Sequence, residues 1–313
     1  MTAMDTYTED VVTSEHFTAY LGDSCERLKE IATDSIGLSV CSPPFASLFV
    51  YSPSLRDLGN SGDREQFIEH YKFIIREQLR VTMPGRIACV HVQQLTTTKS
   101  THGAVGMTDF RGQVIAAFQE EGWIYHGEAT VWKDPQAQSI RTKSFSLAFA
   151  TKNRDSSMSR PALADYLLLF RKPGDNPIPI KNDVTNDEWI DWASPIWLDS
   201  ADGGSPDGTN LAPVWLGIRE TNTLNTRAAK DNGDEKHIAP LQLDFIERCI
   251  RLWSNPDELV LSPFMGIGSE GYVALKLGRR FVGCELKASY WRQAVINLRA
   301  AETAAIAPTL FDN

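Results

Sequence analysis

The sequence lacks the features of a membrane, secreted or zinc-binding protein. No run of about 18 or more apolar residues occurs in the 313 residues, so we expect no membrane-spanning helix. The first fifteen residues are polar and lack the basic-then-apolar layout of a signal peptide. The five cysteines lie far apart and form no Cys-x-x-Cys pair, which argues against disulfides and a structural metal site. We therefore expect a cytoplasmic protein with reduced thiols.

Positive charge is also scarce. The formal net charge is −9, which excludes a protein that coats nucleic acid non-specifically. Residues 176–235 hold four Lys or Arg against eleven Asp or Glu, whereas residues 236–300 hold nine against six. Any surface that binds nucleic acid must therefore be confined to a small part of the protein.

Apolar periodicity predicts strands that alternate with helices, which is typical of an α/β fold with a doubly wound, mainly parallel sheet. We expect strands at 17–21, 36–41, 86–92, 123–132, 144–150, 166–170, 258–262 and 281–285. We expect helices near 24–32, 64–82, 110–121, 241–253, 269–277 and 288–300, the second of them stopped by Pro84-Gly85.

The composition changes between residues 173 and 235, where Pro, Gly, Asn and Asp dominate and helical periodicity fades. Its four tryptophans need something to pack on, so we expect an irregular lobe rather than a disordered linker. These are Trp189, Trp192, Trp197 and Trp215, and we expect their rings in the core. The predicted organisation is a polar tail (1–15), two halves of one domain (16–175 and 236–313) and an inserted recognition lobe (176–235).

An unusual tetrapeptide, Ser42-Pro43-Pro44-Phe45, follows the strand at 36–41. The two prolines stiffen the backbone and supply no N–H, so it offers only carbonyl acceptors. Ser42 adds a side-chain acceptor and Phe45 adds a face for stacking. Such a strand end suits a flat ring that carries an amine.

A turn with two glycines follows the strand at 258–262. Gly266 and Gly268 permit a sharp turn and close approach to a ligand. Glu285 ends the next strand, where a carboxylate can accept hydrogen bonds from both ribose hydroxyls of a nucleoside cofactor. The third glycine of a dinucleotide fingerprint is missing, which argues against an NAD oxidoreductase.

Together these motifs resemble those of the DNA amino-methyltransferases, which methylate N4 of cytosine or N6 of adenine. Ser42-Pro43-Pro44-Phe45 is similar to the family's S/D/N-P-P-Y/F motif, and residues 264–269 (FMGIGS) are similar to F-x-G-x-G-[ST]. The tetrapeptide precedes the turn, as in the family's β class, which disfavours RNA and protein-glutamine methyltransferases. The resemblance implies a Rossmann-like class I methyltransferase fold, S-adenosylmethionine as cofactor and double-stranded DNA as substrate. Several features also resemble orphan enzymes of phages and prophages, so no restriction partner is implied; a homodimer stays open.

The resemblance extends to the cofactor site. Residues 20–24 (YLGDS) resemble the segment beside the cofactor adenine, and the stretch from His237 resembles a helix start at its methionine end, although a capping role for His237 stays open. Ser262 stands where the family usually has Asp, so one anchoring hydrogen bond is lost or replaced. The resemblance assigns cofactor binding to Asp23, Ser24, His237, Ser262, Phe264, Gly266, Gly268, Ser269 and Glu285.

An exocyclic amine is a poor nucleophile because its lone pair is delocalised into the ring. Acceptors aimed at its hydrogens stabilise the developing positive charge, and the Ser42 hydroxyl and the Pro43 carbonyl are the candidates. Methylation of cytosine C5 instead needs a cysteine, usually after a proline, and no cysteine here follows one. Ser42 favours cytosine N4 over adenine N6, which remains the alternative, together with an inactive nucleic-acid-binding relative.

Three polar segments are candidates for DNA contacts. The loop at 51–63 follows the tetrapeptide and could close over a base flipped out of the duplex. The segment 96–111 could reach phosphates, and the segment 219–227 suits base edges or phosphates, with dimer contact as the alternative. The candidate residues are Arg56, Asn60, Lys99, Arg111, Arg219, Asn222 and Arg227.

Overall fold

The computed structural model describes residues 9–44, 64–97, 99–135, 159–193, 221–225 and 240–306, and also 138, 155, 157, 196–197 and 218–219. Within them a nine-stranded sheet runs in the order β1-β2-β11-β10-β3-β4-β8-β7-β9. Its strands are β1 (Asp10–Thr13), β2 (Phe17–Leu21), β3 (Ile36–Cys41), β4 (Thr82–Gln93), β7 (Ile124–Val131), β8 (Asp165–Arg171), β9 (Ile196–Trp197), β10 (Leu259–Ser262) and β11 (Arg280–Glu285). A separate hairpin pairs β5 (Leu95–Thr97) with β6 (Gly106–Thr108).

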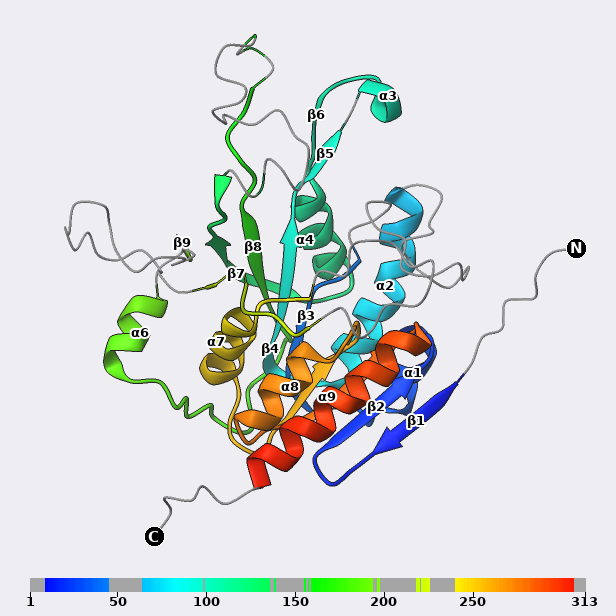
Figure 1. Ribbon diagram of the computed structural model, residues 1–313, viewed down its shortest axis with the longest axis vertical. Coiled ribbons are helices and arrows are strands. Elements are labelled where there is room, and N and C mark those ends of the chain that lie inside the picture. Colours follow the sequence, from blue (N-terminus) through cyan, green and yellow to red (C-terminus); the bar gives the residue numbers. More distant parts are fainter. Residues whose placement is uncertain are drawn as a thin grey trace, which may run out of the picture.

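Helices cover both faces of the sheet (Figure 1). One face packs against α7 (Leu243–Trp253), α8 (Ser269–Lys276) and α9 (Ala288–Ile306), and the other against α2 (Arg64–Val81) and α4 (Phe110–Glu120). Three shorter helices are α1 (Ser24–Arg27), α3 (Lys99–His102) and α6 (Asn186–Trp192). Two hydrophobic cores therefore lie on opposite sides of one sheet, as the alternating pattern predicts.

The central strands are parallel. β10 pairs in parallel with both β3 and β11, and β3 pairs in parallel with β4. All six residues of β3 are buried, and its neighbours Val40 and Cys41 belong to different cores. Beyond β4 the sheet continues with β8, which is antiparallel to both β4 and β7, and with the short β9, which pairs in parallel with β7. The prediction of a mainly parallel, doubly wound sheet is confirmed.

Several elements lie where none was expected, among them β1 and α6. β1 lies within the predicted polar tail. These residues form a strand because they pair antiparallel with β2 at the sheet edge. α6 falls within the predicted irregular lobe, where Thr185 and Glu188 form a capping box at its start. Glu188 also binds Arg251 of α7, with 2.7 Å between Oε1 and Nη1. Local capping and one ion pair thus form a helix that the composition hides.

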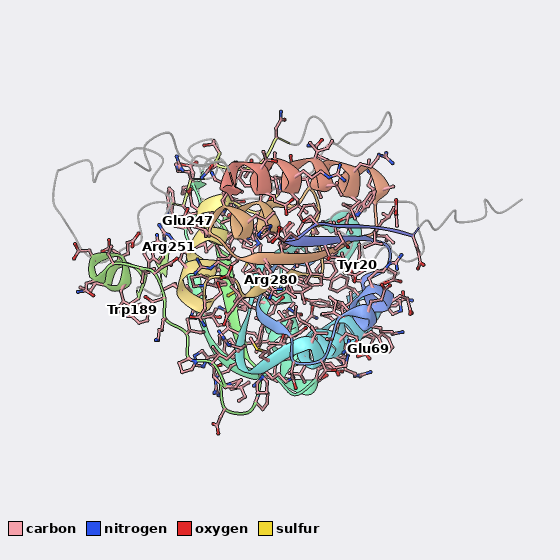
Figure 2. The ribbon with its side chains drawn as sticks, turned by 90° about the horizontal axis from the view of Figure 1, so that it is seen from below. Tyr20, Glu69, Trp189, Glu247, Arg251 and Arg280 are labelled. Carbon is pink, nitrogen blue, oxygen red and sulfur yellow. The ribbon has the colours of Figure 1, made fainter. Side chains whose placement is uncertain are left out.

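The tryptophan prediction is wrong for Trp189, which is 51% exposed on α6, at the outer side of the described molecule (Figure 2). Trp192 packs partly buried against the core, and the guanidinium carbons of Arg248 and Arg251 lie 5.4 and 5.0 Å from its ring centre. The side chains of Trp197 and Trp215, and the strand expected at 144–150, lie outside the described residues.

β4 is longer than expected, since it begins at Thr82 and runs through Pro84 and Gly85. The helix before it ends at Val81, three residues ahead of the proline. Gly85 has φ +72° and donates its N–H to the Lys172 carbonyl at 3.0 Å, which keeps the strand in register. No helix among the residues described here has the length and apolar character needed to cross a membrane.

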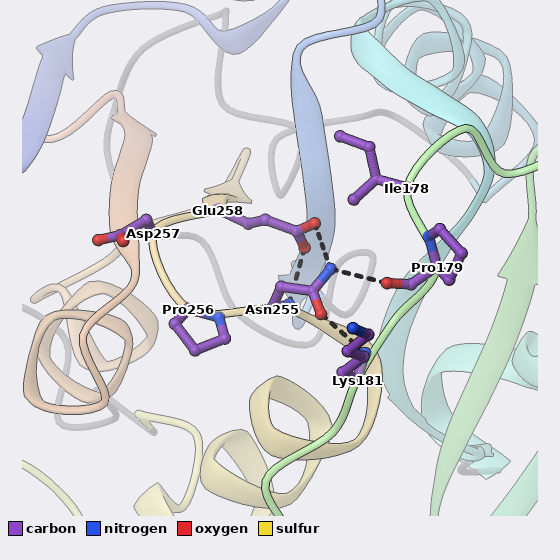
Figure 3. A pocket seen from close by; sticks show the side chains of 7 residues that line it. All are labelled: Ile178, Pro179, Lys181, Asn255, Pro256, Asp257 and Glu258. Carbon is purple, nitrogen blue, oxygen red and sulfur yellow. Dashed lines mark hydrogen bonds between the residues drawn. The ribbon is translucent and has the colours of Figure 1, made fainter.

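A hollow of about 510 Å³ lies before the first residue of β10, at the end of that strand remote from the glycine turn (Figure 3). Asn255 in its wall accepts from the Lys181 N–H at 2.8 Å and donates to the Pro179 carbonyl at 3.3 Å. Glu258 accepts from the backbone N–H of Asn255 at 2.8 Å and pairs with Arg86, whose residue is fully buried. These polar groups are used within the chain, so we interpret the hollow as structural.

Glu258→Ala should destabilise the fold by about 3–5 kcal/mol, because it leaves the buried Arg86 guanidinium without its counter-charge. Urea unfolding at neutral pH measures the change. The control is Glu26→Ala, which removes an exposed pair with Lys29 (2.9 Å) and should leave the midpoint nearly unchanged. Equal midpoints for the two variants would contradict the role assigned to Glu258.

A second buried acid, Glu270 in the first turn of α8, predicts a pH-dependent stability. Burial, with help from the charge of Glu285, raises the pKa of Glu270 from its usual 4.5 to about 8. The folded state therefore holds this proton more tightly than the unfolded state, so stability is full below pH 4.5 and falls as pH rises towards 8. Glu270→Gln should flatten this slope in urea unfolding between pH 5 and pH 9, and unchanged slopes would contradict it.

Candidate active and cofactor sites

Three segments far apart in sequence meet at the carboxyl ends of the parallel strands. The Ser24 hydroxyl donates to the carbonyl of Pro263 at 2.6 Å, within the protein. The Gly22 N–H donates to the Glu285 carbonyl at 2.9 Å. The YLGDS segment, the glycine turn and the end of β11 are thus joined by direct hydrogen bonds, at the edge where parallel α/β sheets bind ligands.

The Glu285 carboxylate is hydrogen-bonded to the backbone of the glycine turn. Its Oε2 accepts the Gly266 N–H and its Oε1 accepts the Lys287 N–H, both at 2.8 Å. Gly266 and Gly268 have φ of +55° and +85°, which other residues rarely adopt. An added Cβ at Gly268 would press on Ala294 at 3.2 Å, whereas one at Gly266 would meet no described atom within 4 Å. The turn therefore packs on α9 and leaves one glycine face open.

Two hydroxyls beside this turn suit a polar ligand. Ser262 and Ser269 are 0% and 3% exposed, and neither Oγ has a hydrogen-bond partner among the described residues. A buried hydroxyl without a partner is costly, so a ligand that bonds to these groups is favoured. The ring centres of Phe264 and Tyr71 lie 5.7 Å apart, and the Asp23 carboxylate accepts the Cys25 N–H at 2.9 Å. The residues present therefore fit a nucleoside cofactor with a polar tail, such as S-adenosylmethionine.

The tetrapeptide leaves β3 next to β10, with Ser42 and Pro44 half-buried and Pro43 buried. Ser42 Oγ lies 3.0 Å from Nδ1 of His91, which comes from the neighbouring strand β4. Cys41 is a fully buried core residue, as predicted.

The hydrogen-bond chain continues into the protein. Nε2 of His91 lies 2.8 Å from Oδ2 of Asp165, at the start of β8, and Nζ of Lys133 lies 3.1 Å from the same oxygen. Burial raises the pKa of the Asp165 carboxyl, but Lys133 and His91 outweigh it and hold that pKa well below its ordinary value. The carboxylate is therefore ionised despite its burial.

The sequence analysis assigns no role to His91, Asp165 or Lys133. The only local signal is a histidine inside the apolar run RIACVHV, since a buried imidazole needs polar partners. Its partners lie on β8 and just beyond β7, and the antiparallel pairing that brings them close is not written in any local motif.

The structure gives some candidate DNA-binding residues partners within the chain. Lys99 is exposed on α3. Arg111 pairs with Glu128 at 2.9 Å and lies 4.7 Å from the Tyr166 ring centre. Phe45, Arg56, Asn60, Arg227 and His237 lie outside the described residues.

The described part of the expected recognition lobe packs beside the cofactor turn. Arg219 and Asn222 both bind Asp244 of α7, with Nη2···Oδ1 and Nδ2···Oδ1 distances of 3.0 and 2.7 Å. Leu224 packs on Ile267 of the glycine turn. This part of the lobe therefore contacts both the turn and α7.

Comparison with known proteins identifies relatives along the chain. The sequence model of a family described as DNA methylase matches residues 36–296. Type II methyltransferase M1.MboII of Moraxella bovis is 41% identical over 100 residues, 31% of this chain and 37% of that protein. M.BglII of Bacillus subtilis is 26% identical over 279 residues, covering 87% and 66%, and M.MjaI of Methanocaldococcus jannaschii is 23% identical over 308 residues, covering 89% of each.

Solved structures share the fold. PvuII DNA methyltransferase, described as cytosine-N4-specific, has a TM-score of 0.61 at 18% identity, covering 96% of this chain and 89% of that one. A Thermus thermophilus protein complexed with S-adenosyl-L-methionine, TTHA0409, has a TM-score of 0.62 at 18% identity, covering 92% and 94%. These likenesses confirm the predicted class I methyltransferase fold. Because the family model spans well over half of the sequence, the chain belongs to the DNA methylase family, the S-adenosylmethionine-dependent enzymes that methylate the N4 or N6 amine of DNA bases.

Proposed function

We propose that the chain methylates the N4 amine of cytosine in double-stranded DNA, on a base flipped out of the duplex. The observation that carries the proposal is the position of the Ser42 hydroxyl. Ser42 directly follows β3, which pairs in parallel with β10, the strand before the glycine turn, and its Oγ lies 3.0 Å from Nδ1 of His91. We propose this oxygen as an acceptor for the amine that takes the methyl group.

The proposed mechanism is one of orientation and charge stabilisation. The Ser42 hydroxyl and the Pro43 carbonyl accept the two amine hydrogens, which localises the nitrogen lone pair and stabilises positive charge as the new bond forms. Phe45, which lies outside the described residues, is proposed to stack on the base. S-adenosylmethionine, held by the glycine turn, Ser262, Ser269 and Glu285, supplies the activated methyl group. With the amine aligned, the new N–C bond would form as the S–C bond to the methyl group breaks, and the nitrogen would release one proton to solvent, without a covalent enzyme intermediate.

The choice of cytosine rests on the residue type at position 42. The acceptor there is a neutral hydroxyl, as is commoner among N4-cytosine enzymes, whereas the adenine enzymes more often have a carboxylate. Adenine N6 remains the alternative, and the product analysis below decides between them.

The proposed DNA surface lies on loops around this edge of the sheet, in a protein of the cytoplasm. Lys99, exposed on α3, is a candidate for contact with a phosphate. Arg111, Arg219 and Asn222 already bind acids within the chain and must exchange these contacts to reach DNA. The lobe at 176–235 is proposed to read the target sequence, and a homodimer is one arrangement that would use it.

Host DNA from cells that express the protein should contain N4-methylcytosine at one short recognition sequence, as measured by sequencing that reports both amine modifications. Ser42→Ala should remove the modification while leaving cofactor binding intact, because only the base loses its acceptor. The matched control Ser35→Ala changes a half-buried serine just before the same strand, whose hydroxyl donates to the Ala32 carbonyl, and should leave methylation unchanged. N6-methyladenine would establish the alternative base, and unmodified DNA despite a folded, cofactor-binding protein would establish an inactive relative.

Glu285→Ala should weaken S-adenosylmethionine binding by roughly tenfold or more, because it removes the ribose acceptor and releases the Gly266 N–H. Titration calorimetry measures the dissociation constant. Glu302→Ala is the matched control, since Glu302 also joins two segments by accepting from Ser14 at 2.7 Å, but far from the turn in sequence. Equal affinities for the two variants would rule out the assigned role of Glu285.

A further inference from the structure

The hydroxyl at the proposed catalytic position begins a buried polar chain whose members come from four places in the fold. Ser42 follows β3, His91 lies on β4, Asp165 begins β8 and Lys133 lies shortly after β7. The distances along it are 3.0, 2.8 and 3.1 Å. The side chains of His91, Asp165 and Lys133 are each less than one-tenth exposed. A buried polar network of this kind needs a reason, because apolar residues would fill the same space at less cost.

The charge state of Asp165 decides the direction of every hydrogen bond in the chain. Because Lys133 and His91 hold its pKa well below the ordinary value, the carboxylate can only accept. Its Oδ1 accepts from Nε2 of Gln93 at 2.9 Å, and its Oδ2 accepts from Lys133 and His91. Nε2 of His91 therefore donates to this carboxylate, and in an uncharged imidazole the other ring nitrogen, Nδ1, carries no proton.

A bare Nδ1 can only accept, so the Ser42 hydroxyl must donate its single proton to it. Both lone pairs of Ser42 Oγ are then free to accept hydrogen bonds from a ligand. The ring is also confined sterically, since its edge meets the uncharged Phe245 ring from α7 at a centroid distance of 5.4 Å.

We infer that His91, held by Asp165 and Lys133, is a positioning residue that fixes Ser42 as a pure hydrogen-bond acceptor and so selects a base edge that presents an amine over one that presents a carbonyl. The inference rests on the proposed function and adds a specificity device to it. A carbonyl at the same place would face two lone pairs and no donor, and a polar mismatch of this kind discriminates strongly. The order of the groups differs from that of a serine hydrolase, because the hydroxyl meets Nδ1 and the acid meets Nε2.

The test compares His91→Leu and His91→Asn on the DNA sequence that the wild-type enzyme methylates. His91→Leu leaves Ser42 without a proton acceptor and should lower kcat roughly 10- to 100-fold, with S-adenosylmethionine affinity unchanged. His91→Asn places an amide oxygen near the position of Nδ1, so it should restore most of the turnover. His126→Asn, the same change at an exposed histidine on β7, is the matched control and should behave as wild type.

A binding measurement reports selectivity without turnover. Duplexes with uracil in place of the target cytosine present a carbonyl where the amine stood, and the wild-type protein should bind them about tenfold more weakly. In His91→Leu this ratio should approach one. Spectra of protein labelled with ¹⁵N-histidine should show a ring with a protonated Nε2 and a bare Nδ1 that disappears in His91→Asn.

Each result has a distinct meaning. A wild-type protein that methylates no DNA overturns the proposed function and this inference with it. Wild-type methylation with unchanged kcat in His91→Leu, or with a kcat in His91→Asn as low as in His91→Leu, overturns the inference alone. If the His91→Leu protein does not fold, the histidine spectra and the uracil duplexes decide: a wild-type His91 ring with a protonated Nδ1, or equal wild-type affinity for the two duplexes, overturns the inference.

Discussion

The parallel pairing of β10 between β3 and β11 is the constraint on which both candidate sites depend. It brings the carboxyl ends of three strands to one edge, so that Ser42, the glycine turn and Glu285 meet although more than two hundred residues separate the first from the last. Hydrogen bonds then hold this edge together: the Gly266 N–H donates to the Glu285 carboxylate, and the Ser24 hydroxyl donates to the Pro263 carbonyl. The two sites are adjacent because the sheet is parallel there, and the chain order of the motifs does not matter to the geometry.

The polar groups at the two ends of β10 differ in how their hydrogen bonds are satisfied, and the difference separates structure from function. Glu258 and Asn255, partly buried before the strand, find partners within the chain, and Glu258 pairs with the buried Arg86. Ser262 and Ser269, beside the glycine turn, are buried more deeply, and their hydroxyls have no partner among the residues that the structure describes. Groups of the first kind hold the fold, whereas groups of the second kind are suited to a ligand.

The sequence predicts most of what is local. The strand ending at Cys41, the glycine turn and Glu285 follow from periodicity and motif, because each depends on residues within a few positions of one another. The polar chain behind Ser42 depends on the β4–β8 and β8–β7 pairings, which join residues such as His91 and Asp165 74 positions apart, so no motif marks it. α6 escaped prediction for a different reason. Its capping box of Thr185 and Glu188 is local in the sequence, but the polar composition around it favours irregular structure.

A serine at the end of β3 makes a chemical demand that a carboxylate does not. A carboxylate accepts from an amine without help, whereas a hydroxyl carries a proton that must be donated elsewhere before both its lone pairs face the base. His91 meets that demand only as a neutral ring, and the ring presents a bare Nδ1 only because Asp165 stays ionised beside Lys133. On this reasoning the neutral acceptor and the buried polar chain form one device, and an aspartate at position 42 would make His91 dispensable.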